Sequence, residues 1–212
     1  MATHSVNTHA QRLTQGDRSA RTRRRLTDAA IRCLHRHGYA ATSTTLIVEE
    51  AGLSRGALVH QFPAKADIMA AVLDAAFEDH VARYREALGE VADPSQRLIR
   101  LVRIAWDVFR LPSAAAEMEI RLAARSDPEL ARSSAAAVAR IDAFAFEGIR
   151  TLALAAGLRD TARIRGVYGL MLSVLRGLQM EWISRPELAP AEETLALLER
   201  SVRRWIDEES RA

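Results

Sequence analysis

Residues 43–62 constrain the fold most, because they allow two short helices separated by a tight turn. A hydroxyl residue precedes each helical segment: Thr42 or Ser43, and then Ser54. Such a side chain caps a helix by accepting a hydrogen bond from a free N–H of the first turn. Gly52 lies between the segments, where the left-handed conformation that closes a helix suits a residue without a Cβ. The stretch therefore predicts helix, turn, helix.

The second of these helices has separate apolar and polar faces. Leu58 and Phe62 lie four residues apart and are expected to be buried together. Arg55 stands at the start of the helix, and His60 shares its polar side. A capped helix, a glycine turn and a second helix that begins with arginine form the layout of a helix-turn-helix.

Charge is concentrated at the same end of the chain. The whole sequence has a formal charge of +3. Residues 1–62, however, contain nine arginines against four acidic residues, whereas the remainder contains 21 basic and 23 acidic residues. A solvated basic tail without a partner would show the same excess. Beside a helix-turn-helix, the excess favours double-stranded DNA as the partner.

The remaining sequence is patterned for helices, without strand-like alternation. Residues 1–18 are polar and aperiodic and are expected to form a flexible arm. Residues 19–63 form the predicted DNA-binding domain, with a first helix over 19–37. Residues 64–212 form the predicted helical ligand-binding and dimerisation domain, entered through a helix of about 36 Å over 64–88. The expected fold class is all-α: an N-terminal three-helix helix-turn-helix domain joined by a long helix to a C-terminal helical bundle.

Other classes of protein find little support. No apolar run approaches a membrane span, and the first residues lack the apolar core of a secretory signal. The single cysteine, Cys33, fits a reducing cytoplasm and reads as a buried small hydrophobe. The sequence contains no phosphate-binding glycine loop, nucleophile motif or metal-ligand spacing. We therefore expect no enzyme activity, cofactor, metal or membrane partner.

The residues from Arg21 to Lys65 resemble the DNA-binding domain of the TetR (tetracycline repressor) family. The matching residues are Ala29-Ala30, His37-Gly38-Tyr39, Thr42-Ser43, Ile47, Glu49-Glu50-Ala51-Gly52-Leu53-Ser54, Arg55-Gly56, Leu58 and Phe62-Pro63-Ala64-Lys65. Three positions depart from the family pattern: Val59, Gln61 and Ala64 stand where tyrosine, histidine and a capping serine or asparagine are usual.

The helix-turn-helix predicts which residues meet DNA. Arg55 and His60 are expected to read bases in the major groove, where Gly56 and Ala57 permit close approach. The residues expected to hold phosphates are Arg23, Thr44, Thr45, Gln61 and Lys65.

Two apolar patterns near the C-terminus suggest a homodimer. The helix over 161–183 carries small residues and one methionine on one side: Gly166, Gly169, Ser173, Gly177 and Met180. The last helix carries an apolar seam: Leu195, Leu198, Val202, Trp205 and Ile206. The resemblance implies that these two helices pair with their copies in a four-helix interface. Packing within one chain is the alternative.

The resemblance also implies a small-molecule effector in the C-terminal domain. The expected pocket lies between the helix over 94–110 and the inner side of the helix over 161–183. Its candidate lining residues are Trp106, Phe109, Met118, Phe144 and Met171, with Arg121 as an anchor for an acidic or polar group. Each aromatic or methionine can instead be ordinary core, and Arg121 can pair with Glu117, four residues earlier.

The helix-turn-helix and the resemblance predict a TetR-type transcriptional regulator. The resemblance further implies a repressor that a small molecule releases from a palindromic operator. An all-helical ligand-binding or scaffold protein without sequence-specific DNA binding is the alternative. The arginines of the first helix argue against that alternative. A helical-bundle enzyme would need a catalytic constellation that the sequence does not contain.

Overall fold

A computed structural model describes residues 14–159, 162–185, 187 and 191–209. Within these residues every helix is of α type apart from one 3-10 position, and no strand is present. The α-helices are α1 (Gln15–Ala41), α2 (Thr44–Ala51), α3 (Arg55–Gln61), α4 (Lys65–Gly89), α5 (Pro94–Phe109), α6 (Pro112–Ala123), α7 (Pro128–Ala155), α8 (Ala162–Ser184) and α9 (Ala191–Glu209). The all-α prediction is confirmed. None of the helices in the described part is long and apolar enough to cross a membrane.

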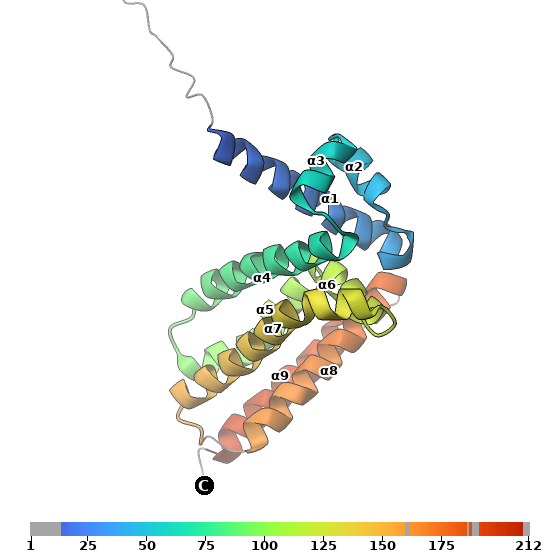
Figure 1. Ribbon diagram of the computed structural model, residues 1–212. Coiled ribbons are helices and arrows are strands. Elements are labelled where there is room, and N and C mark those ends of the chain that lie inside the picture. The colour runs from blue at the N-terminus through green and yellow to red at the C-terminus, as the bar shows by residue number, and fades with distance from the viewer. Residues whose placement is uncertain (1–13, 160–161, 186, 188–190, 210–212) are drawn as a thin grey trace, which may run out of the picture.

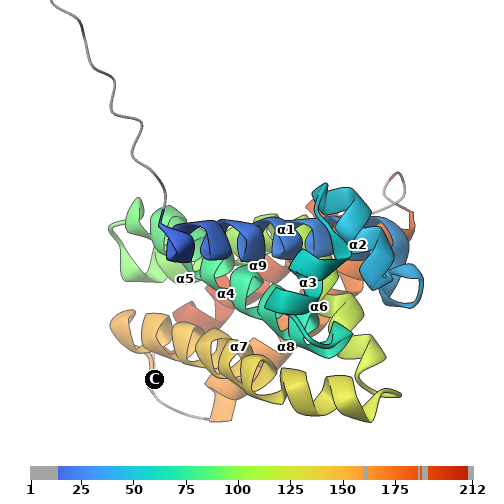
Figure 2. The ribbon, with the colours of Figure 1, turned by 45° about the horizontal axis from the view of Figure 1, so that its top comes forward.

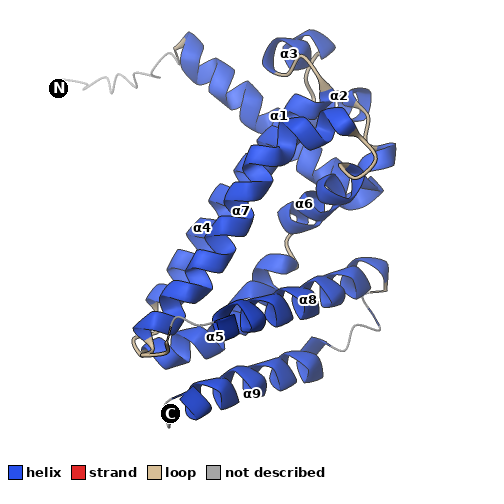
Figure 3. Ribbon diagram, turned by 60° about the horizontal axis from the view of Figure 1, so that its bottom comes forward, coloured by secondary structure: helices blue, strands red, loops and turns tan. Residues whose placement is uncertain are grey.

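The helices form two groups. Figure 1 shows α1, α2 and α3 gathered at one end of the molecule, and Figure 2 shows α2 and α3 together on one side of α1. Figure 3 shows α8 and α9 at the far end, with α4 and α7 running side by side between the two ends. The long helix α4 therefore joins the small N-terminal group to the larger bundle, as predicted.

The first helix begins earlier than the predicted residue 19. Thr14 caps it in a reciprocal arrangement with Asp17. The Thr14 hydroxyl accepts from the Asp17 N–H at 3.1 Å, while the Asp17 carboxylate accepts from the Thr14 N–H at 3.0 Å. This capping box gives the N–H groups of Thr14 and Asp17 hydrogen-bond acceptors, so the helix starts before residue 19. Only residues 14–18 of the predicted arm lie in the described part of the chain, and residues 15–18 are helical there.

The helix-turn-helix follows its sequence signals. The hydroxyls of Ser43 and Ser54 accept from the third N–H group of α2 and α3, at 3.1 Å and 3.2 Å. Gly52 adopts the left-handed conformation (φ 60°) between the two helices. The buried side chains of the three N-terminal helices meet in one core: Leu26, Ala29, Ala30, Cys33, Leu34, Ile47, Leu58 and Phe62.

That core does not end at the predicted domain boundary. It also contains Ile68, Met69, Val72 and Leu73 from the first half of α4, and Ala116 and Ile120 from α6. A second core joins α5, the end of α7, α8 and α9. The N-terminal helices are thus packed on elements of the bundle, which matters for any signal between the two ends.

Candidate nucleic-acid interface and ligand cavity

The polar face of α3 is open to solvent. Arg55, Gly56 and His60 are exposed and Ala57 is half-buried, while Leu58 is buried beneath them. The side chains of Arg55 and His60 form no hydrogen bond or ion pair with any described residue. An exposed arginine at the start of a helix, beside residues without bulky side chains, presents donors that can enter a DNA groove.

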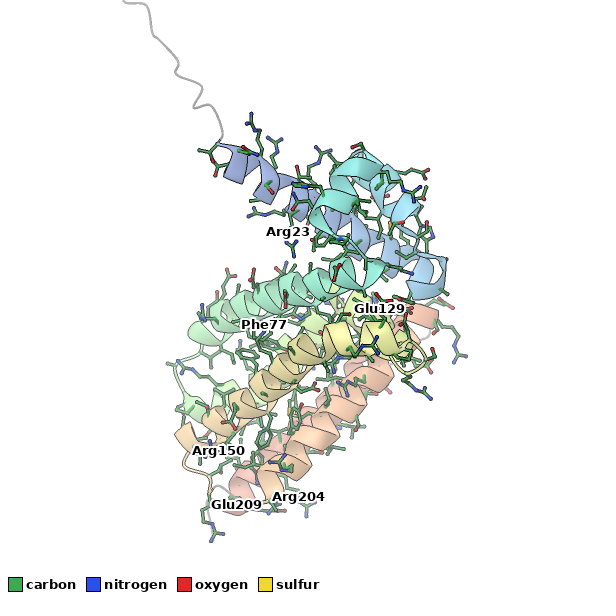
Figure 4. The ribbon with its side chains drawn as sticks, in the orientation of Figure 1. Arg23, Phe77, Glu129, Arg150, Arg204 and Glu209 are labelled. Carbon is green, nitrogen blue, oxygen red and sulfur yellow. The ribbon has the colours of Figure 1, made fainter. Side chains whose placement is uncertain are left out.

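Three of the residues predicted to hold phosphates have partners inside the chain. Arg23 donates from Nη1 to the Gln61 carbonyl at 3.2 Å, and its guanidinium lies over the Phe62 ring; Figure 4 shows the Arg23 side chain on α1. Gln61 donates from Nε2 to the Ser19 hydroxyl at 2.8 Å. These contacts tie α1 to the end of α3, so they position the recognition helix.

Lys65 also has a structural environment. Its ammonium donates to the Tyr39 carbonyl at 3.1 Å and lies 3.9 Å from the centre of the Tyr39 ring. Burial lowers the pKa of Lys65. Of the other predicted phosphate contacts, Thr45 is exposed and Thr44 is half-buried. Arg21 and Arg24 on α1 are also exposed, without a partner in the described part of the chain.

The three departures from the family pattern have local consequences. Val59 is 52% exposed, so this position offers DNA an apolar group in place of a phenol. The side-chain amide of Gln61 donates its hydrogen bond to the Ser19 hydroxyl. The methyl group of Ala64 cannot accept a hydrogen bond and so cannot cap α4. The Asp67 carboxylate instead accepts from the Ala64 N–H at 2.9 Å.

A cavity of about 910 Å³ opens among α4, α5, α6, α7 and α8. Five of the six predicted pocket residues line it: Phe109, Met118, Arg121, Phe144 and Met171. Trp106 does not line it. Trp106 is buried in the second core and packs edge-to-face on Trp182, with ring centroids 6.3 Å apart. The cavity therefore extends toward α4 and α7 more than the sequence prediction placed it.

Arg121 is held by two carboxylates of its own chain. Its Nε donates to Glu117 at 2.8 Å, the pairing foreseen as an alternative, and its Nη2 donates to Asp142 at 2.9 Å. Asp142 comes from α7, and its proximity could not be read from spacing along one helix. An acidic ligand would have to compete with both carboxylates for Arg121.

Sequence reasoning missed a buried histidine in the cavity wall. His80 is 8% exposed, and its Nε2 lies 2.9 Å from the Ser113 hydroxyl. Burial lowers the pKa of His80, which favours the neutral imidazole. A signal was present: His80 continues the buried four-residue series Ile68, Val72 and Ala76 on α4. A polar residue on a buried stripe marks a position where a polar function faces the interior.

Comparison with known proteins agrees with this arrangement. The family described as "Bacterial regulatory proteins, tetR family" matches residues 26–72, which cover the end of α1, the helix-turn-helix and the start of α4. Over these residues the chain belongs to the TetR family. The family is described as one of bacterial regulatory proteins, which agrees with the predicted class of protein.

Individual TetR-type relatives match different lengths of the chain. The HTH-type transcriptional regulator CymR of Pseudomonas putida is 28% identical over 57% of this chain, and the match spans 59% of CymR, less than two thirds. The HTH-type transcriptional repressor Rv1474c of Mycobacterium tuberculosis is 29% identical over 89% of this chain and 96% of its own length. A transcriptional regulator from Saccharomonospora viridis, solved in complex with choline, has the same fold: TM-score 0.71 and 19% identity over 87% of this chain and 96% of its own.

The apolar seam of α9 is buried within the chain and does not lie on the surface, where the predicted dimer interface would need it. Leu195, Leu198, Val202 and Trp205 are 2–4% exposed and belong to the second core, where α9 packs on α5. The amphipathic pattern of α9 thus serves packing within the chain, because a single apolar stripe is satisfied by the nearest apolar surface. On α8, Ser173 and Gly177 are exposed and Gly169 is half-buried.

A different set of apolar residues faces outward on these two helices. Leu170 and Ile183 on α8 and Leu197 on α9 are between 41% and 57% exposed. The sequence analysis named none of them as interface residues. Apolar exposed residues beside small ones form a surface that a second helix pair can cover. Among the described residues, no cluster of three or more His, Cys, Asp or Glu side chains is placed to hold a metal ion.

Proposed function

We propose that the protein is a cytoplasmic homodimeric repressor that leaves a palindromic operator when a small molecule enters the cavity. The observation that carries this proposal is the position of α6. Glu117, Met118 and Arg121 on α6 line the cavity. Glu119, between them, accepts from the Tyr39 N–H at 2.8 Å where α1 bends at Gly38. One helix therefore touches both the ligand space and the DNA-binding helices.

Besides the link through α6, a second contact joins α1 to the start of α7. The hydroxyl of Tyr39 donates to Asp127 at the start of α7, at 3.1 Å. A ligand that shifts α6 shifts these contacts and with them the orientation of α1–α3. The ligand must prefer the arrangement that does not fit DNA, because only a difference in affinity between two states moves their equilibrium.

DNA binding in this proposal uses residues 19–63, with the arm before them and residues 64–212 as the ligand-binding and dimerisation domain. Arg55 and His60 read bases, and Gly56 and Ala57 allow α3 to approach them closely. Arg21, Arg24, Thr44 and Thr45 are the open side chains available for phosphates. Arg23, Gln61 and Lys65 reach phosphates only where their internal contacts leave a donor free.

Dimerisation in this proposal uses the outward face of α8 and α9. Gly169, Ser173 and Gly177 allow a close approach, and the exposed residues Leu170 and Leu197 supply apolar area. Two copies paired there would present their α3 helices about 34–36 Å apart, one turn of DNA. The buried residues Leu195, Leu198, Val202 and Trp205 then support the interface from within each subunit.

The test of DNA binding compares a duplex from the region upstream of the protein's own gene with a random duplex, by fluorescence anisotropy. Arg55→Ala should reduce the preference for the specific duplex by about tenfold or more, because a paired arginine–guanine contact contributes roughly 1–3 kcal/mol. Arg24→Ala should weaken both complexes alike and reduce the salt slope by about one counterion. Equal loss on both duplexes for Arg55→Ala would contradict its role in base reading.

The test of the dimer uses light scattering on paired variants of α8 and α9. Leu170→Glu with Leu197→Glu places charges on the outward face and should give a monomer with weakened operator binding. Leu154→Glu, at a 40% exposed position on α7, is the matched control for a charge placed on an exposed leucine away from α8 and α9. A dimer that survives the double substitution would refute this interface.

A further inference from the structure

We propose that the cavity takes an uncharged, mostly apolar molecule whose hydroxyl group, phenolic or alcoholic, bridges His80 and Glu117. This inference rests on the proposed function, since it names the chemical class of the effector for the same cavity. It starts from a gap between two polar atoms in the cavity wall. The Nδ1 of His80 and the Oε2 of Glu117 lie 4.0 Å apart, too far for a hydrogen bond.

Both atoms at the gap have unused hydrogen-bonding capacity. The other carboxylate oxygen of Glu117, Oε1, accepts from Arg121 at 2.8 Å. The other ring nitrogen of His80, Nε2, is engaged with the Ser113 hydroxyl at 2.9 Å. No described residue donates a hydrogen bond to Glu117 Oε2. The two facing atoms are therefore the ones left for a ligand, and both residues line the cavity.

The surroundings of His80 assign its proton. The imidazole is neutral, because burial lowers its pKa more than the nearby carboxylate of Glu117 raises it. A neutral imidazole has one N–H donor and one acceptor nitrogen. Glu117 can only accept, so the N–H is placed on Nδ1, facing the carboxylate. Nε2 then accepts from the Ser113 hydroxyl, which is itself buried.

A hydroxyl is the group that fits between these atoms. An oxygen placed about 2.8 Å from each atom closes a 4.0 Å gap with ordinary hydrogen-bond lengths. That oxygen must accept from His80 Nδ1–H and donate to Glu117 Oε2. A phenol or alcohol does both, while an ether or ketone only accepts and leaves the carboxylate without a donor.

The charges in the wall exclude an ionic ligand. The charged lining residues are Glu117, Arg121, Asp142, Glu147 and Arg176. Arg121 lies within 2.9 Å of both Glu117 and Asp142, and Arg176 approaches Asp142 at 4.0 Å. Glu147 pairs with Arg150 at 3.1 Å. Since these groups balance one another, an ion entering the cavity would lose its hydration without gaining an unpaired opposite charge.

The body of the ligand is set by the rest of the wall. Phe77 and Phe144 meet edge-to-face with ring centroids 5.4 Å apart, and Figure 4 shows the Phe77 side chain between α4 and α7. Phe109, Met118 and Met171 complete an apolar, adaptable surface. A ligand with an aromatic or aliphatic body and one hydroxyl satisfies both parts of the cavity. Its hydroxyl would also join α4 to α6, two of the bundle helices that reach the DNA-binding core.

The experiment measures binding of four matched compounds to the full chain by isothermal titration calorimetry. These are 4-octylphenol, its methyl ether 4-octylanisole, the anion 4-octylbenzoate and the cation 4-octylbenzylammonium. The phenol should bind about tenfold more tightly than the ether, the benzoate or the ammonium compound, since each lacks one of the two hydrogen bonds or brings an unpaired charge. An ether that binds as tightly as the phenol, or an ion that binds more tightly, would overturn the proposal.

Variants locate the hydroxyl. Glu117→Gln should lower the affinity for the phenol about tenfold while changing that for the ether less than threefold, whereas His80→Phe removes the donor to the oxygen of either compound and should weaken both. Glu117→Gln keeps the shape of the side chain, so it remains informative if His80→Phe does not fold. Asp142→Asn is the matched control: it leaves the gap intact and should leave phenol binding within threefold while improving benzoate binding. Loss of phenol and ether affinity alike in both variants would show that the hydroxyl lies elsewhere and refute the bridge.

DNA release is measured separately with the operator duplex. If the benzoate or the ammonium compound binds best and releases DNA, the proposed function stands and the chemical class is wrong. If the phenol binds as expected but leaves the DNA complex intact, the class stands and the regulatory proposal is wrong. Absence of binding by all four compounds refutes the class proposed here without affecting operator binding.

Discussion

The two halves of α4 show how one helix can be fixed at one end and open at the other. Ile68, Met69, Val72 and Leu73 in its first half are fully buried against the DNA-binding helices. Phe77, His80, Tyr84 and Leu88 in its second half line a cavity of about 910 Å³. Interiors are normally packed as densely as organic crystals. A ligand can therefore supply the missing contacts along the second half of α4. The tightly packed first half would pass any resulting shift of α4 to the DNA-binding helices.

The largest expected difference between the halves is in stability. Phe62→Ala removes a ring that is 1% exposed in the N-terminal core and should cost about 3–5 kcal/mol of unfolding free energy. Phe144→Ala removes a ring that is 37% exposed at the cavity and should cost less than about 1.5 kcal/mol, because part of its surface is already open. Urea denaturation measures both. Similar costs would mean that the two regions are packed alike.

The contact between the regions is tested next at Glu119. Glu119→Ala leaves the Tyr39 N–H without its acceptor and should cost about 1–3 kcal/mol. Glu119→Gln keeps an acceptor and should cost less. Ligand affinity of the free protein should change little in either variant, while ligand-induced release of DNA weakens in the alanine variant. Release that is as efficient in Glu119→Ala as in wild type would exclude this contact from the coupling.

Two glycines sharpen the comparison further. Gly38 has φ +72°, and an added Cβ would lie 3.1 Å from Glu119 Oε2. Gly38→Ala should therefore destabilise the protein by about 1–2 kcal/mol. Gly148 lies in α7 beside the cavity, where an added Cβ meets no atom within 4 Å. Gly148→Ala should stabilise by about 0.5–1 kcal/mol through helix propensity. Thermal unfolding of the two variants should shift in opposite directions, and a shared sign would break the contrast.

The smallest effect concerns alkaline pH. Burial, followed by the hydrogen bond to Asp127, raises the pKa of Tyr39 to about 12. The unfolded chain ionises this phenol near pH 10, so the contribution is fully present below that pH and is lost as pH rises toward 12. Burial also raises the pKa of Tyr84. Tyr39→Phe and Tyr84→Phe should each reduce the fall in unfolding free energy above pH 10. An unchanged pH profile in Tyr39→Phe would mean that its hydroxyl is not held by Asp127.

The sequence by itself determined the helix-turn-helix and the all-helical class. Capping by Ser43 and Ser54, the left-handed Gly52 and the apolar spacing within α3 are local signals, and each acts on residues close along the chain. The exposed positions of Arg55 and His60 follow from the same periodicity. Five of the six residues predicted for a ligand pocket line the cavity, because Met and aromatic residues at helical spacing mark an interior surface.

Only the tertiary structure decided which surface each apolar helix face would pack against. The seam of α9 could satisfy its apolar residues against a second copy or against α5, and spacing within one helix does not distinguish the two. Trp106 was equally suited to a pocket or to a contact with Trp182. Arg121, Lys65 and His80 each have a partner on another helix, Asp142, Tyr39 and Ser113, at separations of 21 to 33 residues along the chain. Long-range packing fixes such contacts, because the helical pattern states that a face is buried but leaves open what will cover it.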